Sequence, residues 1–104
     1  QVKISKDAAL ELEEAASWYE IEQTGLGRRL IDVYEHAIKL LVEPNPPLTS
    51  VVGKASQKGA KKLILHRFLF SLITIQEHQT ITVVAFAHHA RKPGYWRSRL
   101  NPNN

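Results

Sequence analysis

The most informative stretch of the sequence is residues 81–99, ITVVAFAHHARKPGYWRSR. It begins with an apolar, β-branched run at 81–87, which is typical of a buried strand. The run then changes to two histidines, four Lys/Arg, a Tyr and a Trp, and Lys92-Pro93-Gly94 turns the chain. A strand that ends in this way delivers His, Arg and aromatic side chains to the rim of a sheet. We therefore expect the functional site there.

The composition is that of one small globular domain covering residues 1–104. The chain is 43% apolar and 23% charged, which is ordinary for a soluble protein. It has no apolar run of membrane-spanning length and no signal-peptide pattern, so we expect a cytoplasmic protein with no membrane partner. The absence of cysteine excludes disulfides and thiolate metal sites.

Charge is distributed unevenly along the chain. Residues 1–50 carry five Lys/Arg against nine Asp/Glu, a net charge of −4. Residues 51–104 carry nine Lys/Arg against the single acid Glu77, a net charge of +8. Such asymmetry indicates a polyanionic or acidic protein partner for the second half. The alternative is a basic, solvated face that serves solubility.

Two helices are predicted in the first half. Residues 6–23 are rich in Ala, Glu and Leu, and Ser5 is suited to the N-cap. The apolar stripe of this helix is Ala8, Leu12, Ala15 and Tyr19, with Ala16 beside it. A second helix is expected at 28–43, and its apolar face is Leu30, Tyr34, Ala37 and Leu41. The short turn at 24–27 makes the two an antiparallel hairpin.

The glutamates of the first helix are interpreted as a solvated surface rather than paired catalytic carboxylates. They are Glu11, Glu13, Glu14, Glu20 and Glu22.

The second half predicts strands. After the prolines at 44–47, a loop is expected up to Gly59. Strand patterns follow at 61–66, 68–76 and 80–88, with a hairpin tip at 77–79, and Val2-Lys3-Ile4 is a short first strand. The predicted fold is α+β, with the helical hairpin packed on one face of a twisted antiparallel sheet of three to four strands.

The adjacent residues His88 and His89 are the first chemical candidates. On a strand their side chains point to opposite faces, which suits neither a bidentate metal site nor any other shared ligand. No carboxylate or histidine cluster accompanies them and no Gly-rich phosphate loop is present, so we expect no metal and no cofactor. One of the two could act as a general acid or base. The alternative, a histidine held by backbone hydrogen bonds, is equally consistent with the pattern.

A basic set with interleaved aromatics remains. Cations neutralise phosphate and an aromatic ring can stack on an unpaired base, so the set suits RNA. Its members are Lys61, Lys62, His66, Arg67, Arg91, Lys92, Tyr95, Arg97 and Arg99. Trp96 is expected to pack against the sheet instead.

Over residues 4–100 the chain resembles the RelE/ParE superfamily of type II toxin–antitoxin toxins, which includes plasmid stabilisation proteins. The matching stretches are ALELEEAASWYE, Gly25-Leu26-Gly27, LILHRFLF and AHHARKPGYWRSRL, of which the last is the most specific. The resemblance implies the same α+β fold. It also implies a growth-inhibiting toxin that is neutralised by a cognate antitoxin and reaches operator DNA only through that antitoxin.

The resemblance leaves three functions open. RelE-like members are metal-independent endoribonucleases that cleave mRNA on the ribosome, ParE-like members inhibit DNA gyrase without catalysis, and a degenerate member would be non-toxic. In the nuclease version Tyr95 matches the catalytic tyrosine, and Arg91 and His89 fall near the basic residue that stabilises the transition state. A base from His66, His88 or His89 would then act with Arg67, Arg91 and Arg97. Lys61, Lys62, Lys92, Arg97 and Arg99 are the candidate nucleic-acid or partner-binding residues.

Overall fold

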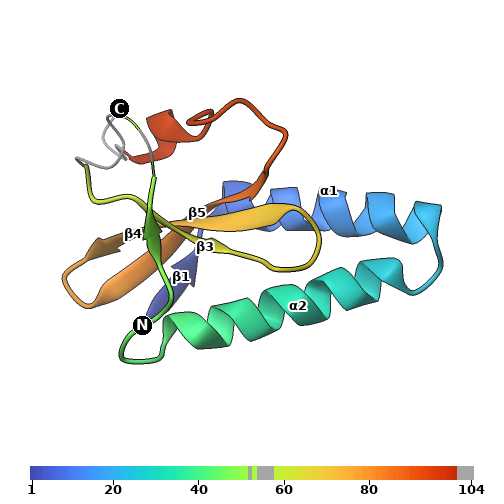
Figure 1. Cartoon of the computed structure of the whole chain (residues 1–104), viewed down its shortest axis with the longest axis horizontal. Helices are drawn as coiled ribbons and strands as arrows, with labels where there is room; N and C mark the ends of the chain where they lie inside the picture. Colours follow the sequence, from blue (N-terminus) through green and yellow to red (C-terminus); the bar gives the residue numbers. More distant parts are fainter. Residues whose placement is uncertain (52, 54–57, 101–104) are drawn as a thin grey trace.

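Two antiparallel helices cover one face of a five-stranded sheet, and the C-terminal segment crosses the opposite face (Figure 1). This computed structural model describes residues 1–51, 53 and 58–100. The elements, in chain order, are β1 (Val2–Ile4), α1 (Lys6–Glu22), α2 (Leu26–Leu41), β2 (Thr49–Ser50), β3 (Lys61–Ile64), β4 (Phe70–Glu77), β5 (Thr80–His88) and a 3-10 helix, η2 (Arg97–Leu100).

The helical hairpin confirms the prediction. Ser5 caps α1, because its hydroxyl accepts a hydrogen bond from the Ala8 amide at 3.1 Å. Between the helices Gly25 adopts a φ of +89°, and the Glu20 carboxylate accepts from the amides of Gly25 and Gly27. The helices meet closely here, since a Cβ on Gly27 would lie 2.5 Å from the Ala16 carbonyl oxygen. Glu20 therefore closes the hairpin.

The main core lies between the helices and the sheet. The predicted face of α2 is buried in full, with Leu30, Tyr34, Ala37 and Leu41 all at 5% exposure or less. Against it pack Phe70 and Phe86, whose rings stack with centroids 4.3 Å apart. On α1 the buried residues are Ala8 and Ala16, flanked by Leu12, Ala15 and Tyr19 as expected. Small residues on this stripe let the two helices approach one another.

The sheet has more strands than predicted. Its order is β1-β5-β4-β3-β2, and β3, β4 and β5 pair antiparallel as expected. The first strand pairs parallel with β5, so the sheet is mixed. The predicted loop up to Gly59 contains the two-residue strand β2, which is too short to leave a pattern in the sequence. Of that loop, residues 52 and 54–57 lie outside the described residues.

Strand boundaries agree with the predictions except at the β3–β4 connection. The predicted return strand at 80–88 is β5, and the predicted tip at 77–79 narrows to a turn at His78–Gln79. Phe68, which was expected in a strand, instead lies in the β3–β4 turn with a φ of +62°. His66 and Arg67 lie in the same turn, beyond the end of β3.

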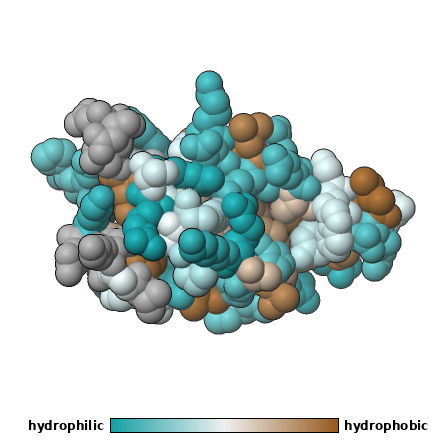
Figure 2. Space-filling view, turned by 90° about the horizontal axis from the view of Figure 1, so that it is seen from above, coloured by the Kyte–Doolittle hydropathy of each residue, from teal (hydrophilic) through white to brown (hydrophobic). Residues whose placement is uncertain are grey.

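A second, smaller core lies on the sheet face opposite the helices, which we call the outer face. Ile73, Val84 and Ala85 project from it and are covered by Trp96 and Leu100. We call residues 91–100, which run across this face, the strap. Trp96 is only 5% exposed, which confirms its predicted packing role. Seen from above, the surface is mainly hydrophilic with scattered hydrophobic residues (Figure 2).

In the part of the chain that the structure describes, no helix is long and apolar enough to cross a bilayer.

The core predicts a contrast between two leucines. Leu30→Ala should lower the free energy of unfolding by about 3 kcal/mol, because the side chain is fully buried and its removal leaves a cavity. Leu10→Ala, at a position 48% exposed on α1, should change it by less than about 0.5 kcal/mol. Urea denaturation followed by circular dichroism measures both. Equal losses would contradict the assigned orientation of the helices.

Candidate functional site

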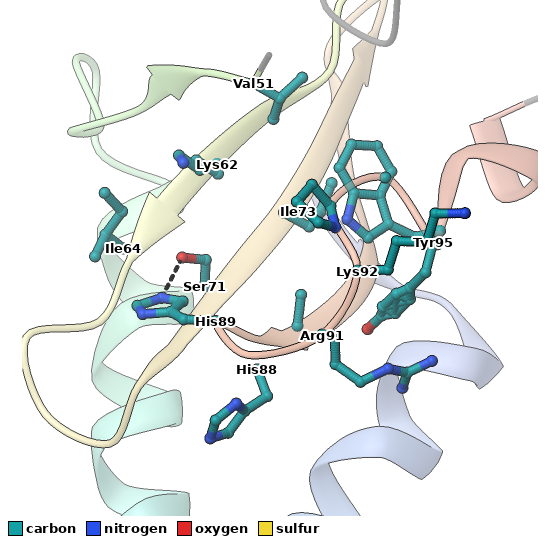
Figure 3. A pocket seen from close by; sticks show the side chains of 14 residues that line it. Val51, Lys62, Ile64, Ser71, Ile73, His88, His89, Arg91, Lys92 and Tyr95 are labelled. Atoms are coloured by element: carbon teal, nitrogen blue, oxygen red, sulfur yellow. Dashed lines mark hydrogen bonds between the residues drawn. The ribbon is translucent and has the colours of Figure 1, made fainter. Parts of the chain in front are cut away.

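The outer face carries a pocket of about 330 Å³ between β3, β4 and the strap (Figure 3). Its floor is mainly apolar, from Val51, Ile64, Ile73, Ala87 and Trp96. The polar and charged side chains that line it are Lys62, Ser71, His88, His89, Arg91, Lys92 and Tyr95. No acidic side chain is among the described residues that line it, so the pocket favours anionic groups.

The two histidines have different surroundings, and only His88 lies on β5, since His89 follows it in a turn. The His89 Nε2 atom lies 2.9 Å from the Ser71 hydroxyl, and that pair stands over the pocket (Figure 3). The His88 ring points away from it and meets the Phe70 ring edge-on at 4.9 Å. Its Nδ1 atom accepts a hydrogen bond from the Ala90 amide. Of the two, His89 is therefore the candidate for acid–base chemistry, and His88 has a packing and turn-forming role.

His66 and Arg67 are not brought to this pocket. Both are exposed in the β3–β4 turn, and they line a separate groove of about 450 Å³ between α2 and β3. The structure thus divides the predicted site residues between two cavities. In the described residues no group of three or more His, Asp or Glu side chains is arranged to hold a metal ion.

Tyr95 lies at the edge of the pocket, with its hydroxyl engaged. That hydroxyl donates a 2.6 Å hydrogen bond to the Glu11 carboxylate. The ring is covered by the Arg91 guanidinium, 3.7 Å from the centroid. Burial, then the hydrogen bond to Glu11 and the Glu11 charge, raise the pKa of Tyr95, although Arg91 and Arg99 oppose this. A phenol in this state is a poor proton donor.

Glu11 is the residue that sequence reasoning missed. Its interpretation as part of a solvated surface is wrong, because its side chain is only 15% exposed. Its carboxylate lies 2.9 Å from the Arg99 guanidinium and accepts hydrogen bonds from Tyr95 and from the Phe86 amide. The signal was available in the helical spacing, since Glu11 falls three residues after buried Ala8.

The carboxylate and Arg99 complete the edge of β5. The short strand β1 pairs with β5 only from Ile81 to Val83, so later backbone groups on that edge need other partners. Arg99 donates to the Val84 carbonyl at 3.0 Å, and Glu11 accepts from the Phe86 amide at 3.0 Å. Ser5 contributes through its hydroxyl, which donates to the Val84 carbonyl. Side chains here take the place of a strand.

The candidate binding residues differ in their exposure to solvent and in whether they form ion pairs. Arg99 is committed to the ion pair with Glu11, with Asp7 a further 3.8 Å contact, so we assign it a structural role. Lys61, Lys92 and Arg97 are exposed, and Lys62 is half-buried beside the pocket. Arg97 lies over Gly94, where an added Cβ would come within 2.8 Å of its guanidinium.

The similarity of this chain to known proteins lies in its structure rather than in its sequence. No protein-family model and no curated protein matches the chain. A solved structure described as the chromosomal ParDE TA system from P. aeruginosa contains a chain that superposes with a TM-score of 0.67. The match covers 85% of this chain and 94% of that one, at 18% sequence identity. The fold is ParE-like. The α+β RelE/ParE-like architecture expected from the sequence is thereby confirmed, with five strands.

The Glu11 interactions predict a pH-dependent stability. Burial alone would raise the pKa of Glu11, but hydrogen bonds from Arg99, Tyr95 and the Phe86 amide, with the charge of Arg99, lower it below its ordinary value of 4.5. A carboxylate with a lowered folded-state pKa stabilises the fold above its unfolded pKa, and this contribution is lost as the pH falls through the folded value. The free energy of unfolding should therefore decrease as the pH is lowered below about 4.5.

Urea denaturation between pH 7 and pH 3 measures this effect. Glu11→Gln should cost about 1.5–3 kcal/mol at pH 7, because it replaces charged hydrogen bonds, and it should reduce the loss on acidification. Glu14→Gln, at an exposed position on the same helix, should follow the wild-type curve. A Glu11→Gln protein with wild-type stability at pH 7 would contradict the assigned role of the carboxylate.

Proposed function

We propose that this chain is the toxin of a type II toxin–antitoxin system. The observation that carries the proposal is the fold, which matches a chain from a structure described as a ParDE TA system over nearly the whole length of both. The basic second half of the chain, at +8, supports it by supplying a surface for an acidic or anionic partner.

Among the toxic mechanisms, non-catalytic inhibition of DNA gyrase is the one that the geometry supports best. The Tyr95 hydroxyl, which a nuclease would need free, donates a hydrogen bond to the Glu11 carboxylate. The Arg91 guanidinium stacks on the same ring instead of facing the His89–Ser71 pair. What the outer face offers is a set of exposed cations beside an apolar pocket, which suits binding more than proton transfer.

Ribosome-dependent mRNA cleavage is the second candidate. It rests on one feature, the pocket in which His89 is held by Ser71 near Lys62. In that version His89 would take the proton of a ribose 2′-hydroxyl and Lys62 would neutralise the phosphate. His66 and Arg67 have no part in it, because they lie in the other groove.

Growth and enzyme assays separate the possibilities. Induced expression in cells that lack the antitoxin should stop growth, and the purified protein should inhibit supercoiling by gyrase without cleaving mRNA on translating ribosomes. Cleavage with unaffected supercoiling would favour the nuclease instead. Unchanged growth despite confirmed expression would indicate a degenerate, non-toxic protein and sink the toxin proposal.

The exposed strap cations provide a sharper test. Lys92→Glu combined with Arg97→Glu should weaken growth inhibition and gyrase inhibition at least tenfold, about 1.4 kcal/mol or more, because both charges face solvent on the proposed surface. Lys39→Glu, an exposed position on α2, should leave both unchanged. Equal effects of the two would show that net charge, not this surface, determines activity.

For the antitoxin we propose the groove between α2 and β3. Strand β2 pairs only with Lys61 and Lys62, so in the described residues the edge of β3 at Leu63 and Ile64 has no strand partner. An extended segment can add to such an edge and place its apolar side chains in the groove. The apolar lining includes Val33, Ala37, Leu40, Leu63 and Leu65. Arg29 and Arg67 supply two cations, and the one acid among the described lining residues, Asp32, is paired with Arg28.

The groove proposal predicts that charge reversal at its rim weakens neutralisation. Arg29→Glu combined with Arg67→Glu should lower antitoxin affinity about tenfold or more, with a salt-dependent effect, because an acidic segment loses two favourable charges. Calorimetry with the cognate antitoxin measures the affinity, and Lys39→Glu is again the control. Unaltered affinity of the double variant would place the antitoxin elsewhere.

A further inference from the structure

Besides the packing of Trp96 and Leu100, one carboxylate of α1 holds the strap to the rest of the fold. Glu11 accepts hydrogen bonds from the Tyr95 hydroxyl at 2.6 Å and from the Arg99 guanidinium at 2.9 Å. On its other side it accepts from the Phe86 amide of β5. One side chain of α1 therefore joins the middle of the strap and its C-terminal part to the sheet.

The same carboxylate also lies close to Arg91, a cation at the pocket. The Arg91 side chain is 56% exposed, yet its guanidinium contacts two other side chains. Its guanidinium lies 3.7 Å from the centre of the Tyr95 ring and 3.9 Å from the Glu11 carboxylate. Figure 3 shows it extended beneath that ring, away from the His89–Ser71 pair.

A cation held in one direction binds an anion at a lower entropic cost than a free one, because a long side chain otherwise loses rotamer freedom on binding. The three side chains contact one another in series. Glu11 fixes the Tyr95 ring through its hydroxyl, and the ring face fixes Arg91. Arg91 is thus the exposed end of a chain of contacts that begins at a largely buried carboxylate.

We propose that Glu11 is a positioning residue, which acts through Tyr95 to hold Arg91 in the direction that an anionic group of the target meets. Recognition of a target rests on the proposed toxin function, whereas the positioning itself is a property of the free chain. The two are therefore tested separately.

The first experiment uses the purified full chain without any partner. In assigned NMR spectra, Glu11→Gln should lose the nuclear Overhauser contacts between the Arg91 methylenes and the Tyr95 ring, and should speed amide exchange at Phe86 at least tenfold. Glu14→Gln should keep both at wild-type values. A folded Glu11→Gln protein that retains the Arg91–Tyr95 contacts would overturn the proposal.

A second variant covers the case in which Glu11→Gln does not fold. Tyr95→Phe removes one oxygen and leaves the Glu11–Arg99 ion pair in place. The contacts between Arg91 and the ring should then weaken while the fold persists. Their survival at full strength would show that Glu11 does not act through the hydroxyl, and would overturn the proposal.

The functional arm is a double-mutant cycle on growth inhibition. Glu11→Gln and Tyr95→Phe should each reduce growth inhibition about tenfold. The double variant should also lose about tenfold, because both substitutions remove the same interaction. Additive losses would mean that Glu11 acts by general destabilisation, which contradicts positioning. If the wild-type chain does not inhibit growth at all, the toxin proposal fails, and the NMR comparison still decides the role of Glu11.

Discussion

The structure depends on how the edge of β5 is completed. This strand is the second in the sheet, between β1 and β4, but β1 pairs with it over three residues only, from Ile81 to Val83. The backbone beyond Val83 is covered, so its polar groups need partners inside the protein. Glu11 and Arg99 supply them from opposite ends of the chain. A largely buried carboxylate is tolerable here because it is paired with a cation and accepts several hydrogen bonds.

Several other features follow from this constraint. Helix α1 must present Glu11 to the sheet, which fixes its rotation and places Ala8 and Ala16 against the core. The strap must return across the outer face for Arg99 to reach the same point, and that return brings Trp96 over Ile73 and Ala85. The outer pocket is then the part of the face that the strap leaves open.

Much of this fold could be predicted from the sequence, and the failures have physical causes. The face of α2 and the limits of β5 were predictable because long apolar patterns of one period dictate a single buried face. The strand β2 was missed because two residues carry no period, and Phe68 because its positive φ depends on the turn that it joins. Glu11 was misassigned, although it lies beside the apolar stripe of α1, because the partners that neutralise its charge lie 75 to 88 residues away in the sequence.

The candidate site was predictable as a set of residues but not as an arrangement. Proximity in the sequence kept Arg91, Lys92 and Tyr95 together, whereas His66 and Arg67 went to the α2–β3 groove. The two cavities are neighbours nonetheless, since Ile64 lines both of them. A segment bound in the groove would therefore touch a residue of the pocket without covering it.

The parallel pairing of β1 with β5 has a consequence for folding during translation. Val2 pairs with Ile81, and the Gln1 carbonyl accepts a hydrogen bond from the Ile81 amide, so β1 can pair only after β5 has been synthesised. Contacts of such sequence separation form late, because most of the chain must be ordered before they close. During translation β1 and α1 leave the ribosome without the strand and strap that complete them. We expect the basic outer face to form only after β5 and the strap have been synthesised, because β1 and α1 lack their partners until then.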